Sequence, residues 1–136
     1  MTKITVENTI QAPVEKVWEY WTKPEHIVNW SFASDDWHTP AAENDLREGG
    51  KFSSTMAAKD GSMSFDFGGV YTKVDEHKAI EYTLGDGRTV SIIFSSEGSA
   101  TKVVETFEAE TQNSVEMQQF GWQAILDNFK KYTEGN

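Results

Sequence analysis

The C-terminal segment from Ser114 to Tyr132, which reads SVEMQQFGWQAILDNFKKY, decides the fold. Its apolar residues recur every three or four positions, which predicts one long α-helix. At 3.6 residues per turn, the apolar residues spread over an arc of roughly 240° around this helix. The arc contains Phe120, Ala124, Met117, Gly121, Tyr132, Ile125, Phe129, Trp122 and Leu126.

The width of this arc predicts contacts on two sides of the helix. A helix that rests on a single sheet needs an apolar stripe only somewhat wider than about 100°. Gln118 and Asn128 also fall within the arc, so they need polar partners or water if they are buried. We therefore expect the helix to close over a sheet, with Gln118 and Asn128 facing an internal, partly hydrated cavity.

The region before this helix predicts the sheet. From Lys51 to Ala109, strand-like runs are separated by four turn-forming stretches, at 59–62, 75–78, 85–87 and 97–99. Four turns separate about five consecutive strands. Links this short join antiparallel neighbours, so we expect a meander.

The N-terminal region predicts one more strand and a first helix. Ile4, Val6 and Ile10 alternate with polar residues, as in a half-buried strand. From Ala12 to Trp21 the apolar side chains share one helical face.

A second, short helix is expected directly afterwards. Thr22, Pro24 and Glu25 have the types and spacing of a helix start, with Thr22 as N-cap. Residues 31–50 then form a long connection, with one short strand around Trp37.

These elements together predict an α+β domain. It has a curved antiparallel sheet of about six or seven strands, two short helices after the first strand, and a long C-terminal helix packed across the sheet. The length of 136 residues suits a single domain over residues 1–136.

Composition narrows the classes of function. The formal charge is −10, from 22 acidic and 12 basic residues, which argues against nucleic acid and against anionic membranes as partners. Aromatic residues make up 12% of the chain, and such rings either interdigitate closely or enclose a cavity. The chain has no Cys and shows no leader peptide or membrane span, so we expect a cytoplasmic protein without a bound cofactor.

Several motifs in order resemble a known superfamily. They are APVEKVW (12–18), TKPEHIVNW (22–30), LREGGKF (46–52) and Gly121-Trp122. The chain is similar over essentially its whole length to the START-like, or polyketide cyclase-like, superfamily. Within it, the chain looks most like bacterial homologues of the C-terminal domain of the heat-shock-protein-ninety ATPase activator. WHTPAAENDLR (37–47) and KDGSMSFDF (59–67) resemble a subgroup labelled polyketide cyclase.

The resemblance implies the helix-grip fold and, in many relatives, a cavity between the long helix and the sheet. Relatives hold lipids, hormones or polyketides there, and they include carriers, receptors, cyclases and co-chaperone domains. The resemblance therefore implies a fold and a pocket and leaves the chemistry open.

Two residues are candidates for catalysis. His38 lies in an acidic stretch, where it could act as a base, but the stretch has no metal-ligand spacing and Asp45 with Arg47 is as readily a salt bridge. Glu105 faces the pocket if Val103 and Phe107 point inward, and its pKa would then be raised by desolvation. In the other register Val104 and Thr106 point inward and Glu105 is surface. The sequence leaves both registers open.

The remaining candidates are residues expected to contact a ligand. They come from the sheet face opposite the long helix and from the helix itself. We expect ligand contacts from Trp30, Trp37, Phe52, Met56, Phe65, Phe67, Tyr82, Phe94, Phe107, Gln118, Trp122, Ile125 and Phe129.

Three functions follow, in order of preference. The first is binding of a small hydrophobic or amphipathic molecule, of the lipid, polyketide or aromatic class, without catalysis. The second is a cyclase or hydrolase that uses a pocket acid or His, and the third is a regulator of a chaperone ATPase. A homodimer and a chaperone remain open as further partners, and no metal site is expected.

Overall fold

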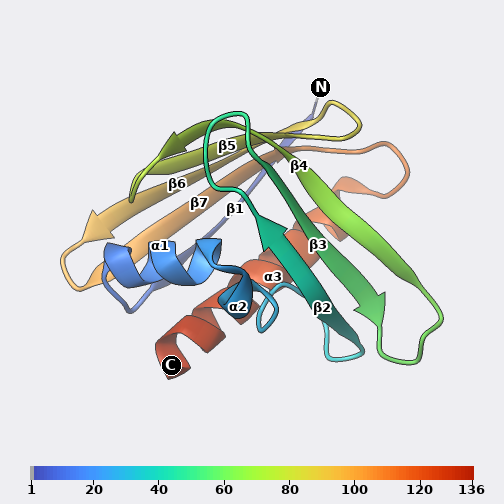
Figure 1. The fold of residues 1–136 in the computed structure, drawn as a ribbon, viewed down its shortest axis with the longest axis horizontal. Coiled ribbons are helices and arrows are strands. Elements are labelled where there is room, and N and C mark those ends of the chain that lie inside the picture. Colours follow the sequence, from blue (N-terminus) through green and yellow to red (C-terminus); the bar gives the residue numbers. More distant parts are fainter. Residues whose placement is uncertain (1) are drawn as a thin grey trace.

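The computed structural model describes residues 2–136 and has the expected α+β architecture (Figure 1). Seven strands and three helices follow in the order β1 (Lys3–Ile10), α1 (Val14–Thr22), α2 (Pro24–Ile27), β2 (Trp37–Asn44), β3 (Lys51–Ala58), β4 (Ser64–Asp75), β5 (Ala79–Leu84), β6 (Thr89–Glu97), β7 (Ala100–Glu108) and α3 (Val115–Gly135).

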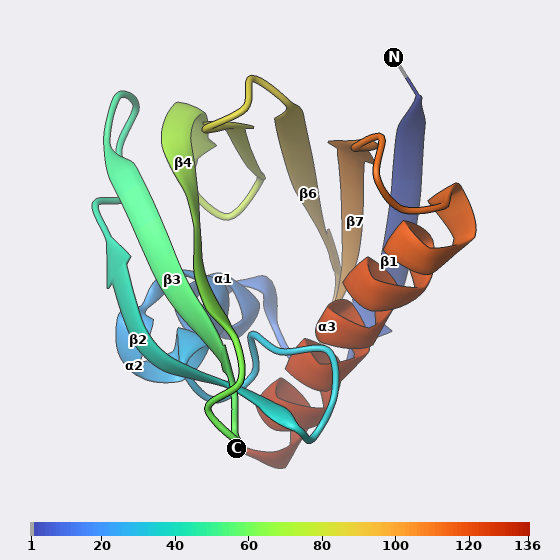
Figure 2. The same cartoon turned by 90° about the vertical axis from the view of Figure 1, so that its right-hand side faces the viewer.

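All seven strands form one antiparallel sheet in the order β1-β7-β6-β5-β4-β3-β2. The predicted five-strand meander is confirmed as β3 to β7, and β2 and β1 extend it at opposite edges. Figure 2 shows the sheet curling into a half-barrel, with α3 running across its concave side. The neighbouring strands approach β4 closely at two glycines, because a Cβ at Gly68 or Gly69 would meet the carbonyl oxygen of Phe52 or Thr83.

The N-terminal elements follow the sequence pattern with one exception. Ile4, Val6 and Ile10 are buried as the alternation predicted. The expected Thr22 N-cap is wrong, because α2 begins after Lys23 and no side chain caps it. Thr22 instead donates its hydroxyl hydrogen bond to the carbonyl oxygen of Trp18 at 2.8 Å, within the last turn of α1.

Helix α3 contacts β1 along one side and the α1–α2 region along another, so the predicted contacts on two sides are present, but the predicted apolar arc is too wide. Leu126 and Phe129 are fully buried, and the helix packs along β1. Phe120 and Met117 are 78% and 63% exposed on the outer side of the helix. The arc was too wide because periodicity places apolar residues around a helix without showing which of them meet a neighbour.

The two polar residues of the arc have different environments. Gln118 is buried at the start of α3, whereas Asn128 donates a hydrogen bond to the carbonyl oxygen of Trp30 at 2.9 Å. Asn128 thus fastens α3 to the segment after α2 and does not line the main cavity. Over residues 2–136, the structure contains no helix long and apolar enough to cross a membrane.

Candidate ligand-binding site

A cavity of about 450 Å³ lies between the curled sheet and the helices. Strands β3, β4 and β5 supply much of its wall, and α3 and the region around α1 and α2 supply most of the rest. The lining residues are Trp21, Ile27, Trp30, Ser31, Phe52, Ser54, Met56, Phe65, Phe67, Tyr71, Ile80, Tyr82, Arg88, Glu105, Glu110, Asn113, Gln118, Trp122 and Ile125.

Nine of the expected ligand contacts lie on this wall. They are Trp30, Phe52, Met56, Phe65, Phe67, Tyr82, Gln118, Trp122 and Ile125. Their side chains reach the cavity because alternate residues of β3 and β4 point to the concave face of the sheet.

Four expected contacts lie away from the wall, and packing explains three of them. Phe107 is covered by Trp122, whose ring stacks on it at 3.9 Å between centroids. Phe94 packs edge-on against Trp18 at 5.3 Å. Phe129 lies in the core, with its ring 4.8 Å from that of Trp30.

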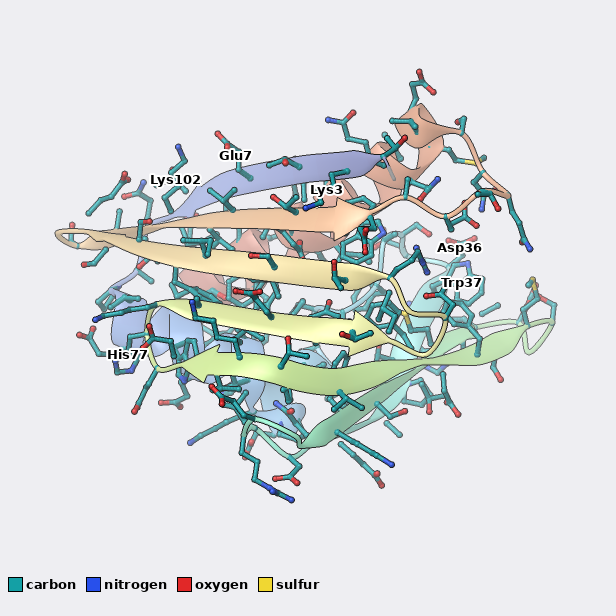
Figure 3. All side chains as sticks on the ribbon, turned by 90° about the horizontal axis from the view of Figure 1, so that it is seen from above. Lys3, Glu7, Asp36, Trp37, His77 and Lys102 are labelled. Carbon is teal, nitrogen blue, oxygen red and sulfur yellow. The ribbon has the colours of Figure 1, made fainter. Side chains whose placement is uncertain are left out.

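The fourth, Trp37, lies at the start of β2, near the end of the sheet (Figure 3). Its ring is 5.8 Å from that of Phe65, which does line the cavity and is 49% exposed. Trp37 therefore packs against Phe65 and does not itself line the cavity.

The aromatic rings of the wall contact one another at steep angles. Phe52 meets Tyr82 at 4.7 Å and 73°, and Phe67 meets Trp122 at 6.0 Å and 77°. Edge-to-face pairs of this kind are favourable beyond their buried area. The rings thus hold each other in place while leaving the cavity open.

Glu105 faces inward, which resolves the register of β7. Val103, Glu105 and Phe107 are buried, at 0%, 6% and 1% exposure, whereas Val104 and Thr106 are less buried. The residues paired with Glu105 on the two neighbouring strands are Val6 and Ile92. Both are apolar, so their side chains offer the carboxyl group no donor.

This environment changes the acidity of Glu105. Burial penalises the charged form and raises the pKa of its carboxyl group to about 8. Burial also raises the pKa of the Tyr82 hydroxyl, and the nearby charges of Glu105 and Tyr71 raise it further. The cavity therefore contains a carboxyl group that is mostly protonated at neutral pH, near a tyrosine that stays neutral.

Within residues 2–136, Tyr71 has a hydrogen-bond partner and Tyr82 has none. The Tyr71 hydroxyl donates a hydrogen bond to Oδ1 of Asn44, whose Nδ2 donates to the carbonyl oxygen of Thr22 at 2.6 Å. Burial raises the pKa of Tyr71, and the bond to Asn44 opposes part of that effect. Asn44 thus connects β2, β4 and α1 beside the cavity.

Other polar groups on the wall are held by their neighbours. Gln118 accepts a hydrogen bond from the backbone nitrogen of Glu110 at 2.9 Å and donates to the carbonyl oxygen of Asn113 at 2.9 Å. Arg88 pairs with Asp86, with Nε 2.7 Å from Oδ2. Gln118 therefore holds the loop after β7, and Arg88 holds the loop before β6.

His38 lies away from the cavity, on an exposed position of β2. Nearby, the expected salt bridge between Asp45 and Arg47 is present at 3.0 Å. In the part of the chain that the structure describes, no three His, Cys, Asp or Glu side chains are grouped as metal ligands. Of the two catalytic candidates, only Glu105 belongs to the site.

Sequence reasoning missed about half of the cavity wall. The missed residues are Trp21, Ile27, Ser31, Ser54, Tyr71, Ile80, Arg88, Glu110 and Asn113. For Tyr71 a signal exists in the strand pairing, because it lies directly opposite Tyr82. The helical period places Trp21 on the apolar face of α1, and in the last turn of α1 this residue lines the cavity. Arg88 and Glu110 lie beside turns, where no period predicts direction.

A half-barrel sheet gripping a long C-terminal helix, with a cavity between them, defines the START-like class of helix-grip domains. A family model supports a narrower assignment. The model for the Activator of Hsp90 ATPase homolog 1-like protein matches residues 11–134. The chain therefore belongs to the Activator of Hsp90 ATPase homolog 1-like family.

Solved structures agree with this assignment. The AHSA1-like protein from Aeromonas hydrophila is 47% identical, with a TM-score of 0.92 over 98% of this chain and 93% of that one. A protein from Cytophaga hutchinsonii is 60% identical, with a TM-score of 0.85 over the same shares. A protein from Nitrosomonas europaea has the same fold at 20% identity, with a TM-score of 0.84 over 98% and 94% of the two chains. No curated protein matches the chain significantly.

Proposed function

We propose that the protein binds a small hydrophobic or amphipathic molecule in the cavity and does so without catalysis. One observation carries the proposal: a cavity of about 450 Å³, walled by aromatic rings, contains a buried carboxyl group. Ligand pockets typically measure about 300 to 1,000 Å³ and combine apolar walls with a few placed polar groups. The cavity has both properties.

Packing supports this reading, since the space coincides with an unusual concentration of rings. Protein interiors are normally close-packed, with few voids larger than a water molecule. Phe52, Phe67 and Trp122 border the space and are only partly buried. A ligand that fills it would bury ring surface, at about 25 cal/mol per Å² of apolar area.

A second candidate is acid–base catalysis in the same cavity. The observation in its favour is Glu105, whose pKa of about 8 suits proton transfer near neutral pH. A cyclase or hydrolase would chemically change the bound molecule. Glu105→Gln would then abolish turnover and leave the fold intact, whereas a carrier returns its ligand unchanged.

A third candidate follows from the family name, which refers to activation of the Hsp90 ATPase. Regulation of a chaperone would act through the outer surface and would not need an open cavity. The test is to add the protein to a bacterial heat-shock ATPase and measure the turnover of the ATPase. A change in turnover that is equal for the wild type and for a variant with a filled cavity would support this candidate.

The direct test is a ligand screen with a filled-cavity variant. Wild-type protein is screened against lipids, flavonoids and polyketides by thermal shift and native mass spectrometry. Ser54 lines the cavity from β3, so Ser54→Phe places a ring inside it. Ser53→Phe is the matched control, because the adjacent position on the strand points to the opposite face.

The proposal predicts that a ligand present at 100 times its Kd stabilises the wild type by about 2.7 kcal/mol. Ser53→Phe should respond in the same way, and Ser54→Phe should fold but show no response. A wild type that no compound stabilises, or a Ser54→Phe variant that responds fully, would contradict the proposal.

A further inference from the structure

The Glu105 carboxyl group has no partner among the described residues of the cavity wall. It is 6% exposed and lines the cavity wall. Within residues 2–136 it forms no hydrogen bond or ion pair, and its pKa responds to burial alone. Buried carboxyl groups are usually hydrogen-bonded or paired, and the oxygens of this one remain accessible from the open cavity, where a ligand could bind them.

We propose that the ligand is an organic cation, an ammonium or quaternary ammonium group on an apolar body, held by Glu105 and the surrounding rings. This proposal rests on the proposed function and adds the charge of the ligand to it. The geometry that supports it is the position of the unpaired carboxyl group on the wall of an aromatic cavity.

The described residues of the cavity wall offer Glu105 no free basic partner. Among the described residues of the wall, Arg88 is the one basic side chain, and its guanidinium is already engaged. Nε lies 2.7 Å from Oδ2 of Asp86, and Nη1 donates to the carbonyl oxygen of Glu108 at 3.3 Å. A bound cation would therefore give Glu105 the ion-pair partner that the described residues of the wall do not provide.

Aromatic rings are suitable neighbours for an organic cation. A cation within about 6 Å of a ring face is attracted by the ring quadrupole, and the attraction is larger when water is excluded. Phe52, Phe67, Tyr82 and Trp122 approach the cavity from three strands and from α3. Neighbouring pairs of these rings are 4.7 to 6.5 Å apart, so a cation among them is near several rings.

Charge favours the same ligand. The whole chain has a formal charge of −10, and such a field attracts cations toward the protein. On the wall itself, Glu105 and Glu110 are acidic, and the charge of Arg88 is offset by Asp86.

Binding of a cation at Glu105 should depend on pH. The titratable groups that share the cavity wall with Glu105 are Tyr71 from β4, Tyr82 from β5, Arg88 before β6 and Glu110 after β7. Burial raises the pKa of both tyrosines, so they stay neutral as Glu105 titrates at about pH 8. A cation prefers ionised Glu105, so it should bind more tightly as the pH rises through 8. A neutral hydrogen-bond acceptor would prefer the protonated carboxyl group, so it should bind more weakly as the pH rises through 8.

The test compares two probes of the same shape. Phenyltrimethylammonium has a permanent charge, and tert-butylbenzene is its neutral isostere. Affinities are measured by calorimetry or thermal shift from pH 6 to pH 9 for the wild type, Glu105→Gln and Glu81→Gln. Glu81 lies on β5 next to Tyr82 and pairs with Lys73, on the face away from the cavity, so Glu81→Gln controls for net charge.

We expect the wild type and Glu81→Gln to bind phenyltrimethylammonium about tenfold more tightly at pH 9 than at pH 7. Glu105→Gln should bind it at least about tenfold more weakly at pH 9, with no dependence on pH. Glutamine has the same shape and needs no ionisation, so circular dichroism should show an unchanged fold.

Three results would overturn the inference. If tert-butylbenzene binds as well as the cation, or if the cation binds more weakly as the pH rises, the ligand is neutral and the proposed function stands. If Glu105→Gln binds the cation like the wild type, Glu105 is not the counter-ion. If neither probe nor any compound of the ligand screen binds, the proposed function fails as well.

Discussion

The two halves of the concave sheet face use similar side chains for different purposes. Along β1, β7 and β6, helices α1 and α3 cover the sheet, and residues such as Val103, Phe94 and Phe107 are 0 to 4% exposed. Along β3 and β4, Phe52, Phe65 and Phe67 face the cavity and remain partly or largely exposed. A ring on this sheet becomes core where a helix covers it and cavity wall where none does.

The path of α3 produces the difference. The helix packs along β1, the edge of the sheet, and the half-barrel curls the opposite edge away from it (Figure 2). Trp122 marks the boundary, because its ring stacks on Phe107 and also lines the cavity.

The largest predicted effect compares a ring of the covered core, on α3, with a ring of the cavity wall, on β4. Phe129→Ala should lower the free energy of unfolding by about 3 to 5 kcal/mol, because Phe129 is fully buried against Trp21 and Trp30. Phe67→Ala should cost less than about 2 kcal/mol, since its ring already borders open space. Urea denaturation measures both values, and equal losses would show that the cavity half is packed like the core.

The second prediction concerns pH and stability. Glu105 binds its proton more tightly in the folded state, so the stability that it contributes is present at low pH and is lost as the pH rises toward 8. As the pH rises from about 5 to 8.5, the free energy of unfolding of Glu105→Gln should increase by roughly 2 to 4 kcal/mol relative to that of the wild type. A stability difference that does not change with pH would show that Glu105 is solvated.

The third prediction separates the two tyrosines of the wall. Tyr71→Phe should lower the free energy of unfolding by about 1 kcal/mol, because Asn44 loses its hydrogen-bond partner. Tyr82→Phe should be close to neutral, because no protein group within residues 2–136 bonds its hydroxyl. The reverse order in thermal denaturation would indicate that the hydroxyl of Tyr82 has a partner in solution.

The smallest effect is expected on the outer face of the sheet. Glu7 and Lys102 lie side by side on β1 and β7, with Oε1 and Nζ 3.7 Å apart (Figure 3). Both side chains are about half exposed, so a double-mutant cycle should give a coupling below about 1 kcal/mol that disappears in high salt. A larger, salt-resistant coupling would mean that the outer face stabilises the sheet more than this account allows.

The sequence predicts the fold well because the fold depends on strong local signals. The alternation at Ile4, Val6 and Ile10 and the four turns after Lys51 specify the strands, and one apolar face specifies α1. Signals that depend on neighbours were less reliable. Phe120 continues the apolar period of α3 but lies in solvent, and Thr22 has the type of an N-cap but bonds within α1.

The site was predicted only in part, for the same reason. The sequence could not place Glu105, because either register of β7 turns apolar side chains inward. One register does so with Val103 and Phe107, and the other does so with Val104. The structure decides between them by burying Val103 and Phe107. Phe94 and Phe65 have the same residue type in strands of the same sheet, yet only Phe65 reaches the cavity, because α1 covers β6. Which half of the sheet a helix covers is a tertiary property that no local pattern contains.

The most direct test of the cavity as a binding site uses the five tryptophans as reporters. Trp21, Trp30 and Trp122 line the cavity, and Trp18 is buried on the far side of the core, against Phe94 and His77. Indole N–H signals are followed by two-dimensional NMR as phenyltrimethylammonium or tert-butylbenzene is added. The account predicts saturable shifts at Trp122, Trp21 and Trp30, with Trp18 unchanged. Shifts confined to Trp18 and Trp37, or no shift with either probe, would contradict it.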